Sequence, residues 1–474
     1  MHSKFTIHWF RSDLRLADNP SFSYACKNAD IIPVYIFDET NKAHFPPGEA
    51  SLTWLWNSLI LLNNSLSGKL LIFKGNPIEI LLTLAMENNV TGVFWNRCYT
   101  PWEVSRDTTI KQEIRSKKIE CKTFNGSLLW EPWEVLKADG TPYKVFTPYY
   151  RRGCLGTKLP RTPLTTPKKI TFAENIILKQ PQLPKTFNQL KWQSKILRHA
   201  LIGEKNAEKK LMTFLDSGIF SYKKGRDFPS SGDVSKLAPN LHFGEISPNQ
   251  ICSKVKNIPS SENTDNFMSE LAWREFSYYL LYHFPKITNQ NLRSQFDRFP
   301  WIFNPKGLNA WKLGKTGVPM VDAGMRELWE TGSMHNRLRM IVGSFLVKNL
   351  LIDWRSGARW FWDCLFDADL ASNTAGWQWI AGSGADAAPY YRIFNPVLQG
   401  KKFDPEGKYI KKYIPELRKL DLKYLFAPWE APPSILSKAG VIMGKTYPYP
   451  IVNLSTSRKT ALEAFKVLKN NASN

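Results

Sequence analysis

The sequence predicts an α/β domain built on a parallel sheet, followed by a larger domain made of helices. In the first 130 residues, short apolar runs alternate with stretches of helical spacing, which is the pattern of βαβ units. Proline then recurs through residues 128–198, where both periodicities fade. From residue 204 onward the spacing is helical and strand signals nearly vanish. A chain of 474 residues is also long enough for two or three domains.

The first domain is expected to hold a sheet whose strands are joined by helices. Strands are predicted at residues 5–10, 31–37, 70–73, 92–95 and 119–124. Helices are predicted at residues 49–66, 77–88 and 103–116. The glycine-rich dinucleotide fingerprint is absent from this region. The carboxyl ends of strands in such a sheet still offer a crevice for a small ligand.

The chain after this sheet is expected to divide into a linker and a helical domain. The predicted boundaries are residues 1–130 for the sheet domain, 131–198 for a surface linker and 199–474 for the helical domain. Helices are predicted at 207–217, 267–282, 311–313, 319–329, 336–351 and 358–365. Residues 371–396 are rich in Gly, Ala and Ser, which pack poorly in a core helix. We interpret them as part of a ligand pocket, with a long covering loop as the alternative.

The charge balance indicates a polyanionic partner. Lys and Arg number 64 against 41 acidic residues, a formal net charge of +23. A solvated lysine-rich surface is the alternative. The six cysteines are scattered without metal-ligand spacing, which fits a reducing cytoplasm, and no metal site is expected. Signal and membrane-spanning segments are not recognisable, so we expect a cytoplasmic protein without a membrane partner.

The stretch from residue 270 to 399 is expected to carry the chemistry, on DNA. Nine of the 18 tryptophans lie between positions 273 and 379. In ELAWREF, Glu270 and Arg274 are four residues apart, which is equally the spacing of an ordinary helical ion pair. In MHNRLRM, Arg337 and Arg339 point to different sides of a helix. One of them can face a phosphate, while the other needs a carboxylate such as Asp367 or Asp369.

Several long segments occur in an order that matches a known family. They include WFRSDLRLADNP, WNRCYTPWEVSRD, YKVFTPYYR, TGSMHNRLRMIVGSFLVKNLLIDWR and DADLASNTAGWQW. Over essentially its whole length, the chain resembles the photolyase and cryptochrome flavoproteins, and specifically the class I cyclobutane pyrimidine dimer photolyases. The resemblance implies a Rossmann-like N-terminal domain and a helical FAD-binding domain.

The resemblance implies FAD, active as FADH⁻, in the helical domain. The matching positions are Tyr222, Val234, Ser235, Lys236, Leu237, Ala238, Phe267, Arg274, Arg339, Asp367, Ala368, Asp369 and Asn373. Arg339 and Asp367 would pair beside the flavin, and Asn373 would face its N5 atom. Val234 and Ala238 stand where the family usually has hydroxyls, and Phe267 where a Trp is common. Phosphate binding would then depend on backbone N–H groups, Ser235 and Lys236.

The resemblance also implies light-driven repair of ultraviolet-damaged DNA, in which excited reduced FAD gives an electron to a dimer flipped out of the duplex. The positions that match the dimer pocket and the catalytic residues are Glu270, Trp273, Asn336, Met340, Asn373 and Trp379. Those that match DNA contacts are Arg226, Arg337 and Gln399. Trp377, Trp354 and Trp301 match a chain that carries electrons to oxidised flavin, and core packing is the alternative for each. A monomer without an obligate protein partner, associated with the nucleoid through DNA, is expected.

An antenna chromophore is implied for the N-terminal domain. His44 and Glu103 fall where folate-type members place contacting residues, although Trp102 replaces an expected Asn. Methenyltetrahydrofolate is favoured over a deazaflavin, and an empty site stays open.

Three other functions were weighed for the whole chain. A (6-4) photolyase needs two active-site histidines in the segment where this chain has Asn336 and Met340. A cryptochrome would signal without repair. A basic DNA-binding protein without catalysis would leave the carboxylate, Arg and Trp residues unexplained.

Overall fold

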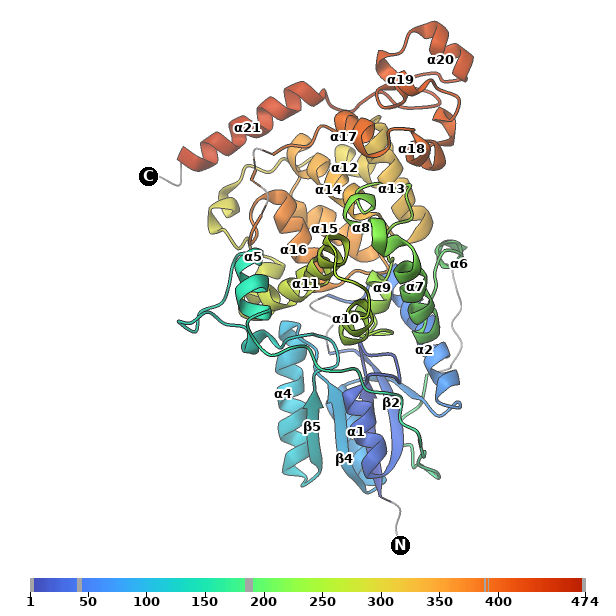
Figure 1. The fold of residues 1–474 in the computed structure, drawn as a ribbon, viewed down its shortest axis with the longest axis vertical. Coiled ribbons are helices and arrows are strands. Elements are labelled where there is room, and N and C mark those ends of the chain that lie inside the picture. Colours follow the sequence, from blue (N-terminus) through green and yellow to red (C-terminus); the bar gives the residue numbers. More distant parts are fainter. Residues whose placement is uncertain (1–3, 41–44, 184–190, 388, 391, 471–474) are drawn as a thin grey trace. The chain divides into compact units, whose positions relative to one another are not determined.

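The chain forms two compact units in the computed structural model, which describes residues 4–40, 45–183, 191–387, 389–390 and 392–470. The first unit comprises Met1–Gln193, Ala200–Asp216 and Ser235–Pro285. The second comprises Ser194–His199, Ser217–Val234 and Lys286–Asn474 (Figure 1). Each unit therefore contains more than one chain segment. The predicted boundaries at residues 130 and 198 stay predictions.

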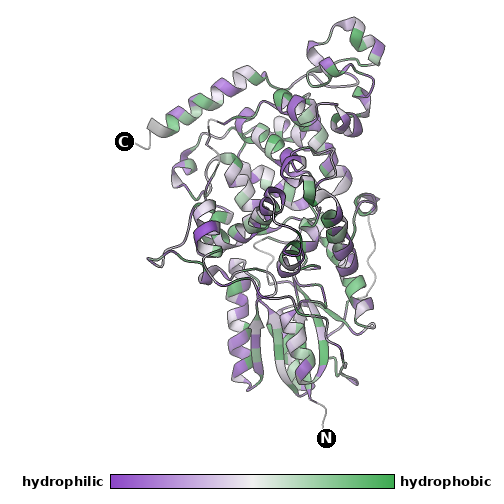
Figure 2. Ribbon diagram, viewed as in Figure 1, coloured by the Kyte–Doolittle hydropathy of each residue, from purple (hydrophilic) through white to green (hydrophobic). Residues whose placement is uncertain are grey.

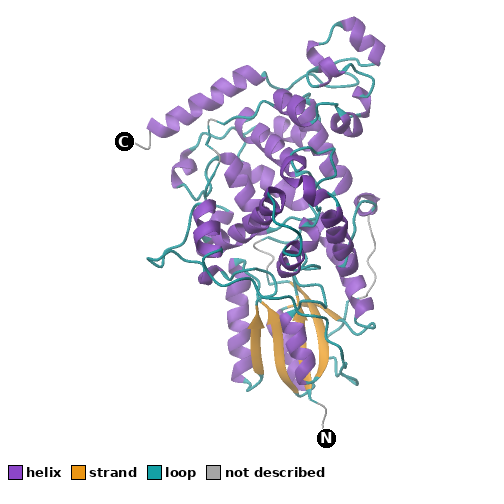
Figure 3. Cartoon of the chain, viewed as in Figure 1, coloured by secondary structure: helices purple, strands orange, loops and turns teal. Residues whose placement is uncertain are grey.

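The first unit contains the predicted parallel sheet (Figure 3). Its five strands are β1 (Phe5–Phe10), β2 (Asp30–Asp38), β3 (Leu71–Gly75), β4 (Val90–Asn96) and β5 (Glu120–Phe124). Their order is β3-β2-β1-β4-β5, and every neighbouring pair is parallel. The central strands are apolar almost throughout, because helices cover both faces of such a sheet. Figure 2 shows these strands largely in the colour of hydrophobic residues.

Four helices connect the strands. They are α1 (Pro20–Asn28), α2 (Glu49–Ser65), α3 (Pro77–Glu87) and α4 (Pro101–Ser116). Proline stands at the start of α1, α3 and α4, where its missing N–H costs nothing. Helices α3 and α4 bury Ile80, Leu84, Ile110 and Ile114 in one cluster with the apolar side chains of the strands. The fold class predicted for this part of the chain is confirmed.

The carboxyl ends of β1 and β4 meet at the point where the strand order reverses, and polar side chains fill it. Arg11 pairs with Asp107 and donates to the carbonyl of Asn96. The Asn96 amide donates to Asp13 at 2.6 Å. All four side chains are buried. These groups bond to one another where the crevice is expected, and binding of a small ligand there stays a prediction.

The rest of the first unit is helical or irregular. Its helices are α5 (Phe146–Pro148), a π-helix at Tyr149–Cys154, α7 (Glu204–Asp216), α9 (Ala238–His242), α10 (Pro248–Val255) and α11 (Glu262–His283). A capping box formed by Ser261 and Thr264 starts α11. Phe146 and Tyr149 are buried within residues 131–198, and the assignment of this stretch as a linker stays a prediction. Its aromatic side chains lie against α11, as described below.

The second unit is helical where the structure describes it. Its main helices are α8 (Tyr222–Gly225), α12 (Pro305–Lys312), α13 (Pro319–Thr331), α14 (Asn336–Ser344), α15 (Trp354–Cys364), α16 (Leu370–Ala381), α17 (Pro396–Phe403), α18 (Lys408–Tyr413), α19 (Leu422–Leu425), α20 (Pro433–Ala439) and α21 (Leu454–Asn470). The helix predicted over 336–351 ends at Ser344 and continues as a π-helix, Phe345–Asn349. Residues from α12 to α20 share one core.

Residues 370–381 form helix α16, although the small residues of 371–396 were expected to pack poorly in a core helix, and the interpretation of this segment as part of a ligand pocket stays a prediction. Asp369 accepts from the backbone of Ser372 and caps the helix, while Gly382 ends it in the left-handed conformation. Leu370, Trp377 and Ile380 bury an apolar side that the small residues between them had obscured. The rest of the segment, from Gly382 to α17, is irregular, and residues 388 and 391 lie outside the described residues.

The described residues contain no helix long and apolar enough to cross a membrane. Within the same residues, no group of three or more His, Cys, Asp or Glu side chains could hold a metal ion.

Candidate functional site

The predicted site residues of the first unit lie mainly on α11. Phe267, Glu270 and Arg274 follow at spacings of three and four and so share one side of the helix. Trp273 lies three residues after Glu270 and is half-buried. Phe267 is buried against Phe214, with ring centroids 4.8 Å apart. The pairing of Glu270 with Arg274 stays a prediction.

Three groups contact the guanidinium of Arg274. It donates to the carbonyl of Ser127 at 2.9 Å and to the carboxylate of Glu275 at 3.1 Å. Its guanidinium also lies 4.8 Å from the centroid of the Tyr278 ring. This geometry fixes one end of the cation while the side chain stays partly accessible.

Glu275 connects α11 to the segment before it. Its carboxylate accepts from the backbone N–H of Leu129 at 2.7 Å and of Trp130 at 3.5 Å. Burial raises the pKa of Glu275 to about 7, although Arg274 and the two backbone N–H groups act in the opposite direction. A buried carboxylate with a charged neighbour thus orients Arg274. Sequence reasoning missed Glu275, although it stands inside the ELAWREF segment.

Trp273 is stacked on a ring of that same preceding segment. The ring of Phe146 lies parallel to it, with centroids 3.9 Å apart and an interplanar angle of 10°. Phe276 meets its edge at 5.8 Å. Phe146 was not among the predicted residues, although the YKVFTPYYR segment that contains it had been noted.

The predicted phosphate loop spans the end of one chain segment and the start of the next. Val234 closes a segment of the second unit, and Ser235 opens a segment of the first. Lys236 adopts a left-handed backbone with φ of 53°, which turns the chain sharply into α9. The Leu237 side chain is buried, whereas Lys236 and Ala238 are exposed. In this predicted phosphate loop, Ser235 carries a hydroxyl group and Lys236 carries an ammonium group.

In the second unit, Arg339 and Asp367 form the predicted ion pair. One guanidinium nitrogen lies 2.9 Å from both carboxylate oxygens. A second guanidinium nitrogen, Nε, donates to the carbonyl of Met334 at 2.9 Å. The Arg339 side chain is 27% exposed and that of Asp367 is 9% exposed. The prediction that one arginine of MHNRLRM pairs with a carboxylate is therefore met by Arg339 with Asp367.

The start of α14, which carries Asn336, Arg337, Arg339 and Met340, is held by two residues that sequence reasoning did not assign. His335 caps the helix by accepting from the Arg337 N–H at 3.2 Å. Burial, together with nearby arginines, lowers the pKa of His335 to about 4. The ring is therefore neutral at physiological pH, as an accepting nitrogen requires.

Glu327 of α13 is the second residue that stabilises the start of α14. It accepts from the backbone N–H of His335 at 3.3 Å and from the hydroxyl of Tyr409 at 2.6 Å. Burial raises the pKa of this carboxyl above its usual range. No local motif marks Glu327, because its partners are 8 and 82 residues away.

Arg337 is engaged by groups of its own unit. It forms an ion pair with Asp227, and its guanidinium lies 4.3 Å from the centroid of the Phe403 ring. It also contacts the sulfur of Met340 at 3.8 Å. The predicted contact of Arg337 with DNA phosphate stays a prediction, and Asp227 would partly neutralise the charge available for it. Asn336, at the first position of α14, is exposed.

Helix α16 positions three further candidates. Asp369 caps it, Ala368 before it is buried, and Asn373 lies on its second turn. The amide nitrogen of Asn373 donates to the carbonyl of Ala358 at 3.1 Å, which leaves the amide oxygen turned away from that bond. Trp377 follows four residues later and so lies on the same side of the helix.

Trp377 and Trp354 are buried in the common core of the second unit, and the half-buried Trp301 packs against it. Trp377 meets Phe361 edge to face at 4.9 Å and Trp311 at 6.2 Å. Trp354 donates from its indole nitrogen to Asn291 at 3.0 Å. A gradient from buried to half-exposed indoles suits a path between the interior and the surface, and it equally suits packing.

The remaining candidates of the second unit are dispersed. Tyr222 is buried beneath the guanidinium of Arg226, 5.6 Å from its ring centroid. Trp379 is half-buried on α16, and Gln399 is half-buried on α17. Their predicted contacts with DNA or cofactor stay predictions.

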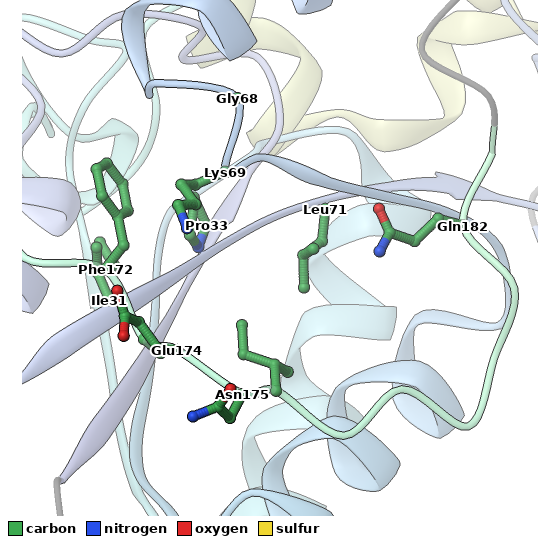
Figure 4. Close-up of a pocket in the computed structure, with 11 residues that line it drawn as sticks. Ile31, Pro33, Gly68, Lys69, Leu71, Phe172, Glu174, Asn175 and Gln182 are labelled. Atoms are coloured by element: carbon green, nitrogen blue, oxygen red, sulfur yellow. The ribbon is translucent and has the colours of Figure 1, made fainter.

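The two residues predicted to contact an antenna chromophore, His44 and Glu103, belong to the N-terminal part of the chain. Glu103 lies in the first turn of α4, accepts a hydrogen bond from Thr100 and lies 3.8 Å from Arg106. His44 lies outside the described residues. A cavity of about 420 Å³ lies at the amino-terminal ends of β2 and β3, where Ile31, Pro33, Lys69 and Glu174 line it (Figure 4). None of the predicted site residues is among those that line this cavity.

Comparison with known proteins gives matches over nearly the whole chain. A family model described as DNA photolyase matches residues 6–168, and one described as FAD binding domain of DNA photolyase matches residues 267–467. A protein of Agrobacterium fabrum named deoxyribodipyrimidine photo-lyase is 43% identical, and the match covers 98% of each chain. Cryptochrome-2 of Arabidopsis thaliana is 38% identical over 97% of this chain and 78% of its own length.

Among solved structures, a bacterial class III photolyase from Agrobacterium tumefaciens superposes with a TM-score of 0.94. It is 42% identical, and the match covers 99% of this chain and 98% of that one. The expected assignment to class I is not supported, since the similar structure is of class III.

Proposed function

Because the chain belongs to the DNA photolyase and cryptochrome family, we propose that it repairs cyclobutane pyrimidine dimers in ultraviolet-damaged DNA, in a reaction driven by light. The observation that carries this proposal is the pairing of Arg339 with Asp367 beside α16, in a chain that matches a photo-lyase from end to end. The net charge of +23 suits a DNA substrate.

The residues fit FAD as the cofactor. In the second unit, the Arg339–Asp367 pair and the amide oxygen of Asn373 offer polar groups to a flavin ring. In the first unit, Arg274, Ser235 and Lys236 offer cationic and hydroxyl groups to a diphosphate. Bound FAD, in its reduced form, supplies the light absorption and the transferable electron. Asn373 contributes a neutral amide, which holds a hydrogen bond without adding charge.

The proposed dimer-binding residues come from three helices. Glu270 hydrogen-bonds a carbonyl or N3–H of the dimer, and Trp273 and Trp379 stack against or flank its bases. Asn336 and Met340 complete the contacts from α14, and Asn336 is exposed as this role requires. Leaving the duplex costs about a few kcal/mol, less for a damaged pair, so the enzyme selects the lesion. Arg226, Arg337 and Gln399 contact the DNA strand.

Trp377, Trp354 and Trp301 are proposed to pass electrons to oxidised flavin. Each indole can be oxidised transiently, and all three belong to or border one core. This role concerns activation of the cofactor, so loss of Trp301 should spare repair by protein that has been reduced beforehand.

A repair assay tests the proposal directly. Purified protein, chemically reduced and exposed to blue light, should restore thymines in an oligonucleotide with one thymine dimer. A dark sample is the control, and a second oligonucleotide with a (6-4) lesion tests the other repair activity. Absence of thymine restoration by illuminated protein with bound FAD would refute the proposed function.

The second candidate is a light-signalling flavoprotein, favoured by the 38% identity to cryptochrome-2 of Arabidopsis thaliana. It predicts FAD binding and photoreduction without repair of either lesion. The same assay therefore separates the two candidates.

We further propose that the repair enzyme is of the class III kind, from its similarity to the Agrobacterium tumefaciens structure. An antenna chromophore, methenyltetrahydrofolate in preference to a deazaflavin, is proposed near Glu103. A near-ultraviolet absorption band beyond that of the flavin would indicate the folate. A monomer that associates with the nucleoid through DNA remains our expectation.

A further inference from the structure

Four side chains of the first unit form a continuous stack that ends on Trp273. The Phe146 ring lies parallel to Trp273 at 3.9 Å. The Phe146 ring also stacks on Tyr150, with centroids 5.8 Å apart and an interplanar angle of 19°. The guanidinium of Arg151 then lies 5.7 Å from the Tyr150 ring centroid. Parallel rings in this order form a column that starts at an exposed cation and ends at a half-buried indole.

The column rests on rigid supports. Phe146 and Tyr150 lie on α5 and the π-helix after it, and Tyr149 between them is buried against Phe276 at 4.9 Å and Tyr279 at 4.7 Å. The backbone N–H of Tyr143 donates to the Tyr279 hydroxyl at 2.9 Å, which ties the approach to α5 onto α11. The position of Phe146 relative to α11 is therefore fixed by several contacts besides its own.

Among the ring contacts of the described residues, one face of Trp273 is stacked. Phe146 covers that face, and Phe276 meets the ring at an angle of 71°. In the described part of the chain, no other ring lies parallel to Trp273 within stacking distance. The indole is half-buried, so part of its surface is accessible to a further flat group.

We infer that Phe146 is a positioning residue for the damaged base: it fixes the plane of Trp273 so that a flipped pyrimidine stacks on the opposite face. This inference rests on the proposed function. An indole on a helix can turn about its side-chain bonds, and ordering it on binding would weaken the complex. Stacking on Phe146 restricts that rotation before the substrate arrives. Glu270, one turn earlier on α11, is then held at a constant place relative to the ring.

Replacement of Phe146 tests the inference in the full chain with FAD bound. Phe146→Leu keeps an apolar side chain and removes the flat ring, and Phe146→Tyr restores the ring. Phe243→Ala is the matched control, because Phe243 is 6% exposed, close to the 7% of Phe146, and stacks on Trp54 at 6.1 Å and 9°. The measurement is the dark affinity for an oligonucleotide with one thymine dimer, compared with the undamaged strand.

Phe146→Leu should weaken binding of the dimer on the order of tenfold, a part of what a base gains by stacking on an aromatic side chain. Binding of undamaged DNA and the rate of flavin photoreduction should stay within about twofold of wild type, since both need other residues. Phe146→Tyr should regain the preference for damage, and Phe243→Ala should keep it.

Wild-type preference in Phe146→Leu would overturn the inference, as would an equal loss in Phe243→Ala, which would mean general destabilisation. Failure of the proposed function gives a different result. In that case the wild-type protein itself shows no preference for the dimer and repairs no dimer. That result would overturn both.

Discussion

Asp367→Asn should lower both the stability of the protein and its retention of FAD. In the native pair, one nitrogen of Arg339 donates to both oxygens of Asp367 at 2.9 Å. The substitution removes the negative charge and one acceptor, and it leaves the guanidinium with its bond to the Met334 carbonyl. Nothing else in the side chain changes, since Asn has nearly the same shape and volume.

The expected loss of stability in Asp367→Asn follows from the solvent exposure of Arg339 and Asp367. Removing one partner of a fully buried ion pair costs about 3–5 kcal/mol, whereas an exposed pair is worth about 0–1 kcal/mol. Asp367 is 9% exposed and Arg339 is 27% exposed, so the cost lies between these limits. We expect the free energy of unfolding to fall by about 2 kcal/mol, near the value of a charged hydrogen bond.

The assay is urea unfolding of the flavin-loaded protein, followed by far-ultraviolet circular dichroism and by release of flavin. Asp353→Asn is the matched control, because Asp353 pairs with Arg355 at 3.0 Å with both side chains about one third exposed, 31% and 28%. Asn also preserves the cap that Asp353 gives to α15. The control should cost less than about 1 kcal/mol. Equal effects of the two substitutions, or an unchanged midpoint for Asp367→Asn, would refute the reasoning.

Trp377→Phe should abolish photoreduction of oxidised flavin while chemically reduced protein still repairs dimers, and normal photoreduction would exclude Trp377 from an electron path. Arg337→Ala should weaken DNA binding and reduce the slope of log affinity against log salt by about 1, and an unchanged slope would remove Arg337 from the phosphate contacts. Glu275 has a folded pKa of about 7, above its usual 4.5, so the stability it contributes is fully present below about pH 4.5 and is lost as pH rises through 7. Wild type should therefore lose stability relative to Glu275→Gln over this range in urea titrations, and parallel pH profiles would contradict the raised pKa.

The sheet could be predicted because its signals are local. Strand β1 was located to the residue, since FTIHWF is an apolar run bounded by polar residues. Strand β3 begins at Leu71 and extends to Gly75, beyond the predicted 70–73, because pairing with β2 continues through Lys74 and Gly75. Backbone pairing of that kind depends on a neighbour that the local sequence does not reveal.

The helix α16 was not predicted, for a definite physical reason. Small residues were taken as unfavourable for a core helix, whereas a cap at Asp369 and three large buried side chains decide in favour of one. Helix propensity is a weak preference, and burial of an apolar side overrides it.

The supporting carboxylates could not have been predicted in the same way. A carboxylate partner was expected for one arginine of MHNRLRM because a buried cation demands one, and the resemblance to the photolyase family selected Arg339 with Asp367. Glu327 and Glu275 act on residues far away in the chain, at separations of 82 and 146 residues for Tyr409 and Leu129. Such contacts exist only once the helices are packed.

Trp377 owes its place to a glycine on the neighbouring helix α15. A Cβ atom at Gly357 would lie 2.1 Å from the indole, and one at Gly343 would lie 3.5 Å from it. The ring thus rests directly against the backbone of α15 at Gly357, which fluctuates less than side chains do. Electron tunnelling falls off exponentially with distance, so in the proposed electron-transfer role a Trp377 seated on backbone has a narrow spread of transfer rates. Glycine at position 357 would in this way set the timing of the reaction without taking part in it.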